Sequence, residues 1–299
     1  MEKISTIYDV GMNNGDDTGY YLAKGHNVIA IEANPTLCRI AENRFFKEIS
    51  QGRCTILNVG VADKSCLMDF YLNTENHITS TFIPQPNEDK IYEIFPTKVE
   101  KLSDIIKKYG DPIFVKIDIE GMDFIVLREI FLAGIIPINI SAESHKIDVF
   151  CMLVSMGYDE FKLVNSASVS KDFANHEIRL LNGETVPFRF KHNSSGPFGE
   201  DLPGRWLTKE YVLNQFSSRE HTWQDVHARN ARSIYQRDAE KTRSLAAVEE
   251  VELAYKYWGR YPDVAQHAVY GEHGELGVRG AWEHYQQHGR HEAKRIWGA

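Results

Sequence analysis

The sequence predicts an α/β fold with a doubly wound sheet of seven strands and a helical C-terminal extension, and three observations support it. Short β-branched runs alternate with helical stretches from Met1 to about Lys191, which is typical of a parallel sheet covered by helices. A glycine-rich turn follows the first run. The composition changes beyond Gly204, and the 299 residues leave room for one domain of about 200 residues and a smaller appendage.

The predicted strands are Ile7 to Val10, Asn27 to Ile31, Thr55 to Val61, Ile113 to Ile117, Ile138 to Ala142, Glu160 to Val164 and Glu177 to Leu181. The segment His192 to Gly204 combines Gly, Pro, Ser and Asn, so it is predicted to be a loop. We therefore place the domain boundary just after this loop, with the α/β domain at 1–205 and the extension at 206–299.

The extension has a different composition from the α/β domain. It holds all five tryptophans, which are Trp206, Trp223, Trp258, Trp282 and Trp297. No Gly or Pro occurs from Arg205 to Trp258, and apolar residues such as Val226, Ile234 and Leu245 recur at roughly helical spacing. These features predict one or two long helices in that stretch, followed by shorter helices, the first of which opens at Pro262.

Charge and cysteine content exclude several classes of protein. The net charge of -8 does not favour nonspecific binding to nucleic acid, so we expect no nucleic-acid partner. The four cysteines form no CxxC pair, and reduced thiols in a cytoplasmic protein are the simplest interpretation. No apolar stretch of about 18 residues occurs, so we expect no membrane span.

The opening segment YDVGMNNGDDTGYYLAKGHNVIAIEANP carries the strongest functional signal. A strand ends at Asp9, the chain turns through Gly11 and Gly15 into a helix, and a second strand ends at Glu32. Glycines let the backbone of such a turn approach a ligand, and Glu32 is placed to accept hydrogen bonds from two ribose hydroxyls. The unit therefore predicts a site for a nucleoside.

The charge of the turn indicates which nucleoside. A dinucleotide would bring a pyrophosphate to this turn, which reads DxGxxxGDD rather than GxGxxG and carries Asp9, Asp16 and Asp17. Carboxylates beside phosphates are unfavourable, increasingly so as the site is desolvated. S-adenosylmethionine has no phosphate and carries a positive ammonium and sulfonium. It is therefore the predicted cofactor.

The turn, Glu32 with Pro35, and the later KIDIEG (Lys116 to Gly121) together resemble the class I methyltransferases of the FkbM family. The resemblance covers about residues 7 to 190 and implies a seven-stranded Rossmann-like fold and S-adenosylmethionine as methyl donor. It also implies, as the usual reaction, O-methylation of a hydroxyl on a sugar or natural product.

The resemblance also implies which residues hold the cofactor. Asp9, Gly11 and Asn13, with Gly15 in the same turn, are expected along its methionine part, and Glu32 at its ribose. Asn34 is expected to assist at the ribose edge. Asp63, after the third strand, is expected to accept from the adenine amino group or, equally, to cap a turn.

Residues for the methyl transfer itself are expected after the fourth and fifth strands. Lys116, Asp118 and Glu120 share one face if the fourth strand continues through them, and ligands in open α/β sheets lie beyond the carboxyl ends of strands. Asp118 is expected to orient the methionine ammonium or the acceptor hydroxyl. Glu120 is expected either to line the cleft or only to begin the next helix.

The fifth strand runs into Glu143 and His145 at the same edge. A hydroxyl transfers slowly to a sulfonium methyl unless its proton is accepted, so a base is expected. His145 is the leading candidate and His192 the competing one, although alignment alone also supports methyl transfer. Asp118, Glu143 and His145 would suit Mg or Mn, but no metal is expected because the family is not marked by a metal motif.

The sequence says less about the identity of the acceptor and the role of the extension. The loops Asn76 to Phe82 and His192 to Trp206 offer hydroxyls, amides and an aromatic ring that suit a glycan or other polyhydroxyl acceptor. Two alternatives remain, an inactive methyltransferase fold that acts as a scaffold in glycan assembly and an N-methyltransferase.

The segments at Tyr257 to Ala265 and Ala281 to Arg295 resemble a helical module at the ends of bacterial FkbM proteins and glycosyltransferases. That module is expected to dock a partner or dimerise, with glycan contact as the second interpretation. His284, His288 and His291 are expected to be surface or packing residues rather than metal ligands.

Overall fold

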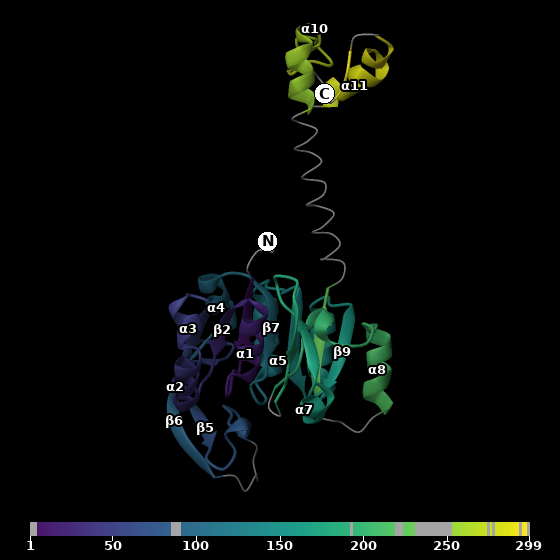
Figure 1. Ribbon diagram of the computed structural model, residues 1–299. Coiled ribbons are helices and arrows are strands. Elements are labelled where there is room, and N and C mark those ends of the chain that lie inside the picture. The colour runs from purple at the N-terminus through teal and green to yellow at the C-terminus, as the bar shows by residue number, and fades with distance from the viewer. Residues whose placement is uncertain are drawn as a thin grey trace. The chain divides into compact units, whose positions relative to one another are not determined.

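The computed structural model describes residues 5–84, 91–191, 194–218, 224–230, 253–273, 276, 279–292 and 295–297 (Figure 1). The chain divides into two compact units, residues 1–231 and 232–299. The first unit thus continues past Arg205, where the sequence analysis ended it, because a strand that completes the main sheet comes later in the chain.

A seven-stranded sheet forms the centre of the first unit, with the order β3-β2-β1-β7-β8-β12-β9. Its strands are β1 Thr6–Val10, β2 Asn27–Ile31, β3 Cys54–Leu57, β7 Pro112–Ile117, β8 Asn139–Ser144, β9 Glu160–Asn165 and β12 Gln224–Arg229. β12 runs antiparallel to β8 and β9, and the other pairings are parallel. The chain proceeds from β1 toward β3 on one side and from β7 toward β9 on the other, which makes the β1–β7 junction the switch point where ligands bind in such sheets.

The predicted α/β fold and the number of strands are confirmed, but the predicted seventh strand is wrong. The segment predicted at Glu177 to Leu181 forms β10 (His176–Arg179), which pairs with β11 (Thr185–Phe188) in a separate two-stranded sheet. The seventh strand is β12, inside the stretch predicted to be helical. Its Val226 and Ala228 join the apolar core, whereas the alternate Asp225 and His227 are buried but polar, so only two apolar residues mark the strand in the sequence.

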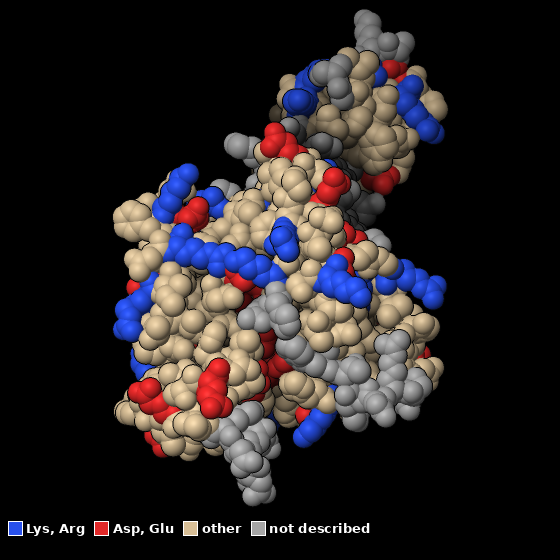
Figure 2. Space-filling model, turned by 60° about the horizontal axis from the view of Figure 1, so that its bottom comes forward, with Lys and Arg blue, Asp and Glu red and all other residues tan. Residues whose placement is uncertain are grey.

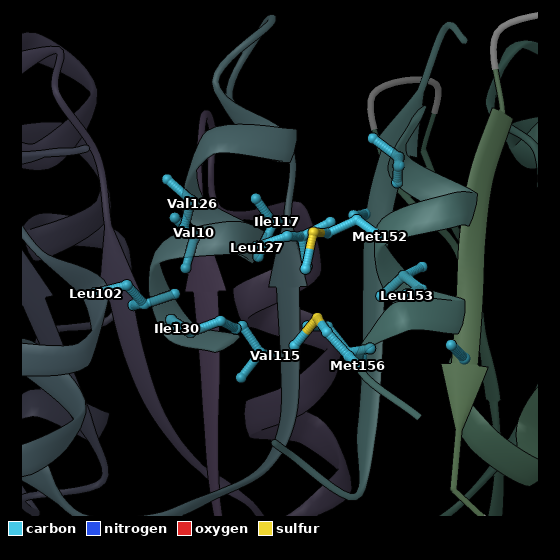
Figure 3. Packing of buried hydrophobic residues seen from close by; sticks show 14 of the residues in the cluster. Val10, Leu102, Val115, Ile117, Val126, Leu127, Ile130, Met152, Leu153 and Met156 are labelled. Atoms are coloured by element: carbon cyan, nitrogen blue, oxygen red, sulfur yellow. The ribbon is translucent and has the colours of Figure 1, made fainter. Parts of the chain in front are cut away.

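Helices cover both faces of the sheet (Figure 1). They are α1 Asp16–Lys24, α2 Pro35–Arg44, α3 Phe46–Ser50, α4 Leu102–Tyr109, α5 Asp123–Leu132, α6 Ile147–Ser155, α7 Val169–Asp172 and α8 Lys209–Ser218. Alternate side chains of each strand point to opposite faces, so α4, α5 and α6 pack on one face and α1 and α2 on the other. Figure 3 shows Val126 and Ile130 of α5 and Met152 of α6 gathered against Val115 and Ile117 of β7.

A small sheet of order β4-β6-β5 adjoins the predicted third strand. Its strands are β4 Gly60–Val61, β5 Cys66–Asn73 and β6 Tyr92–Glu100, and a short 3-10 turn, η1 (His77–Thr79), follows β5. The run predicted as a single strand from Thr55 to Val61 is therefore divided between β3 of the main sheet and β4 of this one. Two further 3-10 turns are η2 Ser166–Ser168 and η3 Gly199–Asp201.

The second unit has its own small aromatic core. Residues 253–260 are helical, and α10 Pro262–Ala265, α11 Arg279–Gln287 and η4 Gly289–His291 follow. Tyr257 and Trp258 are buried, and the indole Nε1 of Trp258 donates to the carbonyl of Tyr270 at 2.9 Å. The helix predicted to open at Pro262 is present. In the part of the chain that the structure describes, every helix is too short or too polar to span a bilayer.

Candidate active site

The glycine-rich turn after β1 is shaped by close backbone contacts. The amides of Gly11 and Met12 both donate to the carbonyl of Ile31 at 3.0 Å, which ties the turn to the end of β2. Gly11 has φ +80°, and a Cβ there would lie 1.8 Å from the carbonyl oxygen of Asp118. Only glycine fits this position without strain. The turn therefore lies directly against the chain that leaves β7.

Glu32 is held at the end of β2 by two backbone donors. The amide of Asn13 donates to Oε2 and the amide of Asn34 donates to Oε1, both at 2.8 Å. Burial raises the pKa of Glu32, and these two hydrogen bonds lower it in part. The side chain of Asn34 accepts from the amide of Thr36 and caps α2. Glu32 is thus fixed in one orientation, and Asn34 contributes through its amide.

A first pocket opens where these segments meet. Among the described residues, its lining includes Gly11, Asn13, Glu32, Leu37, Gly60, Phe70, His77, Ser80, Thr81, Phe82, Asp118 and Glu120. Asn13 also has a left-handed backbone, with φ 52°, and its Oδ1 atom is buried without a hydrogen-bond partner among the described residues. The pocket therefore offers a fixed carboxylate and an amide oxygen that is free to accept.

Lys116 lies in a buried charge cluster beneath this pocket. Its side chain is 4% exposed, and its Nζ atom lies 3.5 Å from Asp9, 3.8 Å from Asp17 and 3.4 Å from Asp118. The same nitrogen donates to the carbonyl of Gly11 at 2.9 Å. Lys116 thus joins the glycine turn to the segment after β7.

The cluster alters the ionisation of its members. Burial lowers the pKa of Lys116, but Asp118, Asp9 and Asp17 raise it, and the pKa stands well above its usual value. Burial raises the pKa of Asp17 and that of Asp118 to about 6 each, although Lys116 opposes both shifts. Lys116 therefore stays charged and keeps these carboxylates more acidic than burial alone would leave them.

A second pocket adjoins the first and has a volume of about 540 Å³, within the range of small-molecule sites. Its lining includes Thr79, Tyr92, Asp123, Phe124, Glu143, His145, Lys146 and Asp148. Thr81 and Glu120 line both pockets, and the Thr81 hydroxyl donates to the carbonyl of Glu120 at 2.7 Å. Figure 2 shows red acidic atoms recessed near the middle of the face that it brings forward.

Glu120, Glu143 and His145 lie together in the second pocket. Nε2 of His145 is 3.4 Å from Oε1 of Glu143, and one ligand atom from each of the three residues lies within 4.8 Å of the others. The hydrogen bond that His145 donates to Glu143 raises the pKa of His145 to about 9, against the effect of burial. Burial, then Glu143 and Asp118, raise the pKa of Glu120 to about 8. These residues can hold protons near neutral pH or bind a metal ion.

The structure separates the other predicted site residues. Asp9 is fully buried and accepts from the Thr18 hydroxyl at 2.6 Å, so it lies beneath the first pocket and does not line it. Gly15 caps α1 at φ +77°, with the ring of Phe45 beside it. Asp63 is exposed and lines a separate hollow beside Lys101. His192 lies outside the described residues.

The two predicted substrate loops have different positions. Residues of the first, including His77, Thr79 and Thr81, line the two pockets. The described part of the second loop packs on α1, where Ser194 and Ser195 bond to Asp17, and it lines neither pocket.

The sequence predicted no role in the site for Lys116 or Asp17, and Thr81 was predicted only as part of the loop Asn76 to Phe82. The position of Lys116 in KIDIEG, on the same strand face as Asp118, was the available signal.

A family model and several solved structures are similar to the chain. The family described as the methyltransferase FkbM domain matches residues 9–163, just over half of the chain. No curated protein matches the sequence. Among solved structures, the methyltransferase FkbM from Methylobacillus flagellatus KT is similar at 16% identity and a TM-score of 0.35, over 53% of this chain and 39% of that one.

Two further similar structures come from other bacteria. A SAM-dependent O-methyltransferase from Thermotoga maritima has 11% identity and a TM-score of 0.34, over 76% of this chain and 59% of that one. A precorrin-6y C5,15-methyltransferase from Geobacter metallireducens GS-15 has 9% identity and a TM-score of 0.34, over 76% and 81%. The chain spans about two fifths of the FkbM structure that it resembles.

Proposed function

Because the chain belongs to the FkbM methyltransferase family, we propose that it transfers a methyl group from S-adenosylmethionine to a hydroxyl of a glycan or another polyhydroxyl molecule. The observation that carries this proposal is the meeting of two pockets at Thr81 and Glu120. The groups that line the first pocket suit a nucleoside, but its volume of about 70 Å³ must widen to admit one, whereas the second pocket, of about 540 Å³, is large enough for a sugar and is lined by polar side chains. A methyl group would pass between them.

The residues of the first pocket fit S-adenosylmethionine. Each carboxylate oxygen of Glu32 accepts one backbone amide and keeps a lone pair for a ribose hydroxyl. Asn13 Oδ1 is a free acceptor, and Asp118, whose side chain is 32% exposed, lines the pocket as an anion for a cationic ligand. When bound, the cofactor supplies a methyl group activated by its sulfonium.

The chain's own residues would orient the acceptor and receive its proton. Glu120 lines both pockets, so its carboxylate is better placed than that of Glu143 to accept a proton from a hydroxyl beside the methyl group. His145, the base candidate favoured by the sequence, lies behind it in the second pocket and pairs with Glu143. We therefore assign the proton to this cluster, with Glu120 as its first acceptor once it is ionised, which its pKa of about 8 shifts to mildly alkaline pH. The rest of the rate enhancement would come from alignment.

An amine is the second candidate acceptor. Glu120, Asp123, Glu143 and Asp148 give the second pocket an acidic lining, with Lys146 as a basic neighbour. A protonated amine would be attracted to this lining but must lose its proton before it attacks the methyl group. Methyl transfer to an amino sugar at nitrogen, rather than oxygen, would favour this candidate.

The test is calorimetric titration of the full chain with S-adenosylhomocysteine, with NADH as the control ligand. We expect micromolar binding of S-adenosylhomocysteine alone. Transfer of labelled methyl groups to a panel of sugars and amino sugars then identifies the acceptor class. Binding without transfer to any acceptor would favour the scaffold interpretation, and absence of binding would overturn the proposal.

The second unit, residues 232–299, is proposed to dock a partner or a second copy of the chain. Its aromatic core is self-contained, yet Trp282 is 36% exposed and Tyr255 is 51% exposed. Light scattering should give a larger mass for the full chain than for one monomer, and a chain ending at residue 231 should be monomeric.

A cytoplasmic location is also proposed. The free thiols of all four cysteines support a reducing, cytoplasmic location.

A further inference from the structure

We propose that Glu120, Glu143 and His145 form a binding site for one divalent metal ion, best represented by Mn²⁺, in the second pocket. Carboxylate oxygens suit Mg²⁺ and Mn²⁺, and imidazole nitrogen suits transition metals, so the mixed set favours Mn²⁺ over Mg²⁺. The sequence suggested a related set, Asp118, Glu143 and His145, but predicted no metal; the structure replaces Asp118 by Glu120 in this set.

The distances between the ligand atoms are close to those of a metal site. One oxygen of each glutamate and a ring nitrogen of His145 lie within 4.8 Å of one another. Ligand atoms at about 2.1 Å from one ion lie roughly 3.0 Å apart when they are neighbours and roughly 4.2 Å apart when they are opposite, so the side chains have to close by at most about 2 Å. The exposed side chain of His145 can make such a movement by rotating about its own bonds.

The fold brings the three ligands from two neighbouring strands. Glu120 lies in the turn after β7, and Glu143 and His145 lie at the end of β8, which pairs in parallel with β7. Glu143 is 3% exposed and is therefore a rigid ligand, whereas His145 lies toward solvent. The second pocket leaves room for water molecules or an acceptor to complete the coordination.

The surrounding charges favour a cation independently of this geometry. Asp123 lines the same pocket and Asp225 is the strand partner of Glu143, and both carboxylates are almost fully buried. Lys116 faces Asp9, Asp17 and Asp118, on the side of the first pocket. A divalent ion at the second pocket would neutralise the carboxylates of Glu120 and Glu143, which burial otherwise destabilises.

Asp118 is a poorer ligand than Glu120 for this ion. Its Oδ2 atom lies 3.4 Å from the ammonium of Lys116, so a metal would have to compete with that ion pair. Glu120 lines both pockets, and an ion held there would lie beside the acceptor. It would lower the pKa of an acceptor hydroxyl bound to it. That consequence rests on the proposed function, whereas ion binding does not.

The experiment is titration of the EDTA-treated, dialysed full chain with MnCl₂, followed by electron paramagnetic resonance of free Mn²⁺ and by calorimetry. We expect one ion per chain. Glu120→Gln and His145→Ala should each weaken binding about tenfold or more. Asp148→Asn is the matched control, because Asp148 lines the same pocket without belonging to the ligand set, and it should leave the affinity unchanged.

Absence of a bound ion, or equal affinity in the wild type and the two ligand variants, would overturn the proposal. Circular dichroism of each variant separates loss of a ligand from loss of the fold. Binding of S-adenosylhomocysteine is measured on the same metal-free samples. Mn²⁺ binding without S-adenosylhomocysteine binding would retain the metal site and reject the proposed function, and the opposite result would reject the metal site alone.

Discussion

The two halves of the central sheet contribute to the site in different ways. In the half formed by β1 and β2, Gly11, Asn13 and Glu32 come from one short stretch and are fixed by backbone amides. In the half formed by β7, β8 and β12, the polar side chains of Glu120, Glu143 and Asp225 come from distant segments. The first half is therefore a rigid site encoded locally, and the second is a set of interacting charges that depends on the whole fold.

Lys116 joins these two halves, so its removal should have the largest effect. Lys116→Met keeps the length of the side chain but leaves Asp9, Asp17 and Asp118 buried without their cation. We expect a loss of about 3–5 kcal/mol in the free energy of unfolding, measured with urea. Lys107→Met, at an exposed lysine on α4, is the control and should change stability by less than about 1 kcal/mol. Equal effects of the two changes would show that Lys116 does not join the halves.

The same contrast explains how much could be predicted from the sequence. The turn at Gly11 and the carboxylate of Glu32 were predictable because their spacing follows from one strand, turn, helix and strand. The strand that carries Asp225 was not, because its alternation contains only two apolar residues, Val226 and Ala228, within a stretch whose other apolar residues recur at helical spacing. The position of Asp63 away from the first pocket could not be predicted either, because the chain after β3 leaves the main sheet for a second one.

The carboxylate of Glu32 should control cofactor affinity without affecting the second half. Glu32→Ala removes two hydrogen-bond acceptors that are expected to hold the ribose, and we expect S-adenosylhomocysteine to bind about 2–4 kcal/mol more weakly in calorimetry. Glu42→Ala, at an exposed glutamate on α2, should bind normally. Unchanged affinity in Glu32→Ala would remove Glu32 from the ribose site.

Substitution by alanine should reduce the free energy of unfolding more at Gly11 than at another left-handed glycine. Gly11→Ala places a Cβ against the carbonyl of Asp118, whereas at Gly52, with φ +70°, nothing lies within 4 Å of an added Cβ. Both changes carry the cost of a left-handed alanine, about 1–2 kcal/mol, and Gly11→Ala should cost about 1–3 kcal/mol more because of the overlap. Urea unfolding of the two variants measures the difference, and similar losses would mean that the turn can move away from Asp118.

The stability of the fold should also fall in acid, because the second half of the sheet contains the buried His227 on β12. This side chain is 2% exposed, its two ring nitrogens lack hydrogen-bond partners among the described residues, and its ring lies parallel to that of Phe114. Burial lowers its pKa from the usual 6.5 to about 3. The folded state therefore favours neutral His227. Its contribution to stability is complete above about pH 6.5 and is lost as the pH falls toward 3, because the unfolded chain takes up the proton first.

The slope of stability against pH that is due to His227 should approach about 1.4 kcal/mol per pH unit between these limits. His227→Phe keeps the ring packing and removes the titration, so urea unfolding from pH 7 to pH 4 should show a shallower loss of stability than in the wild type. His273→Phe, at an exposed histidine of the second unit, is the matched control and should leave the slope unchanged. If His227→Phe kept the wild-type slope, His227 would not be the source of the acid response, and the two halves of the sheet would not differ in this respect.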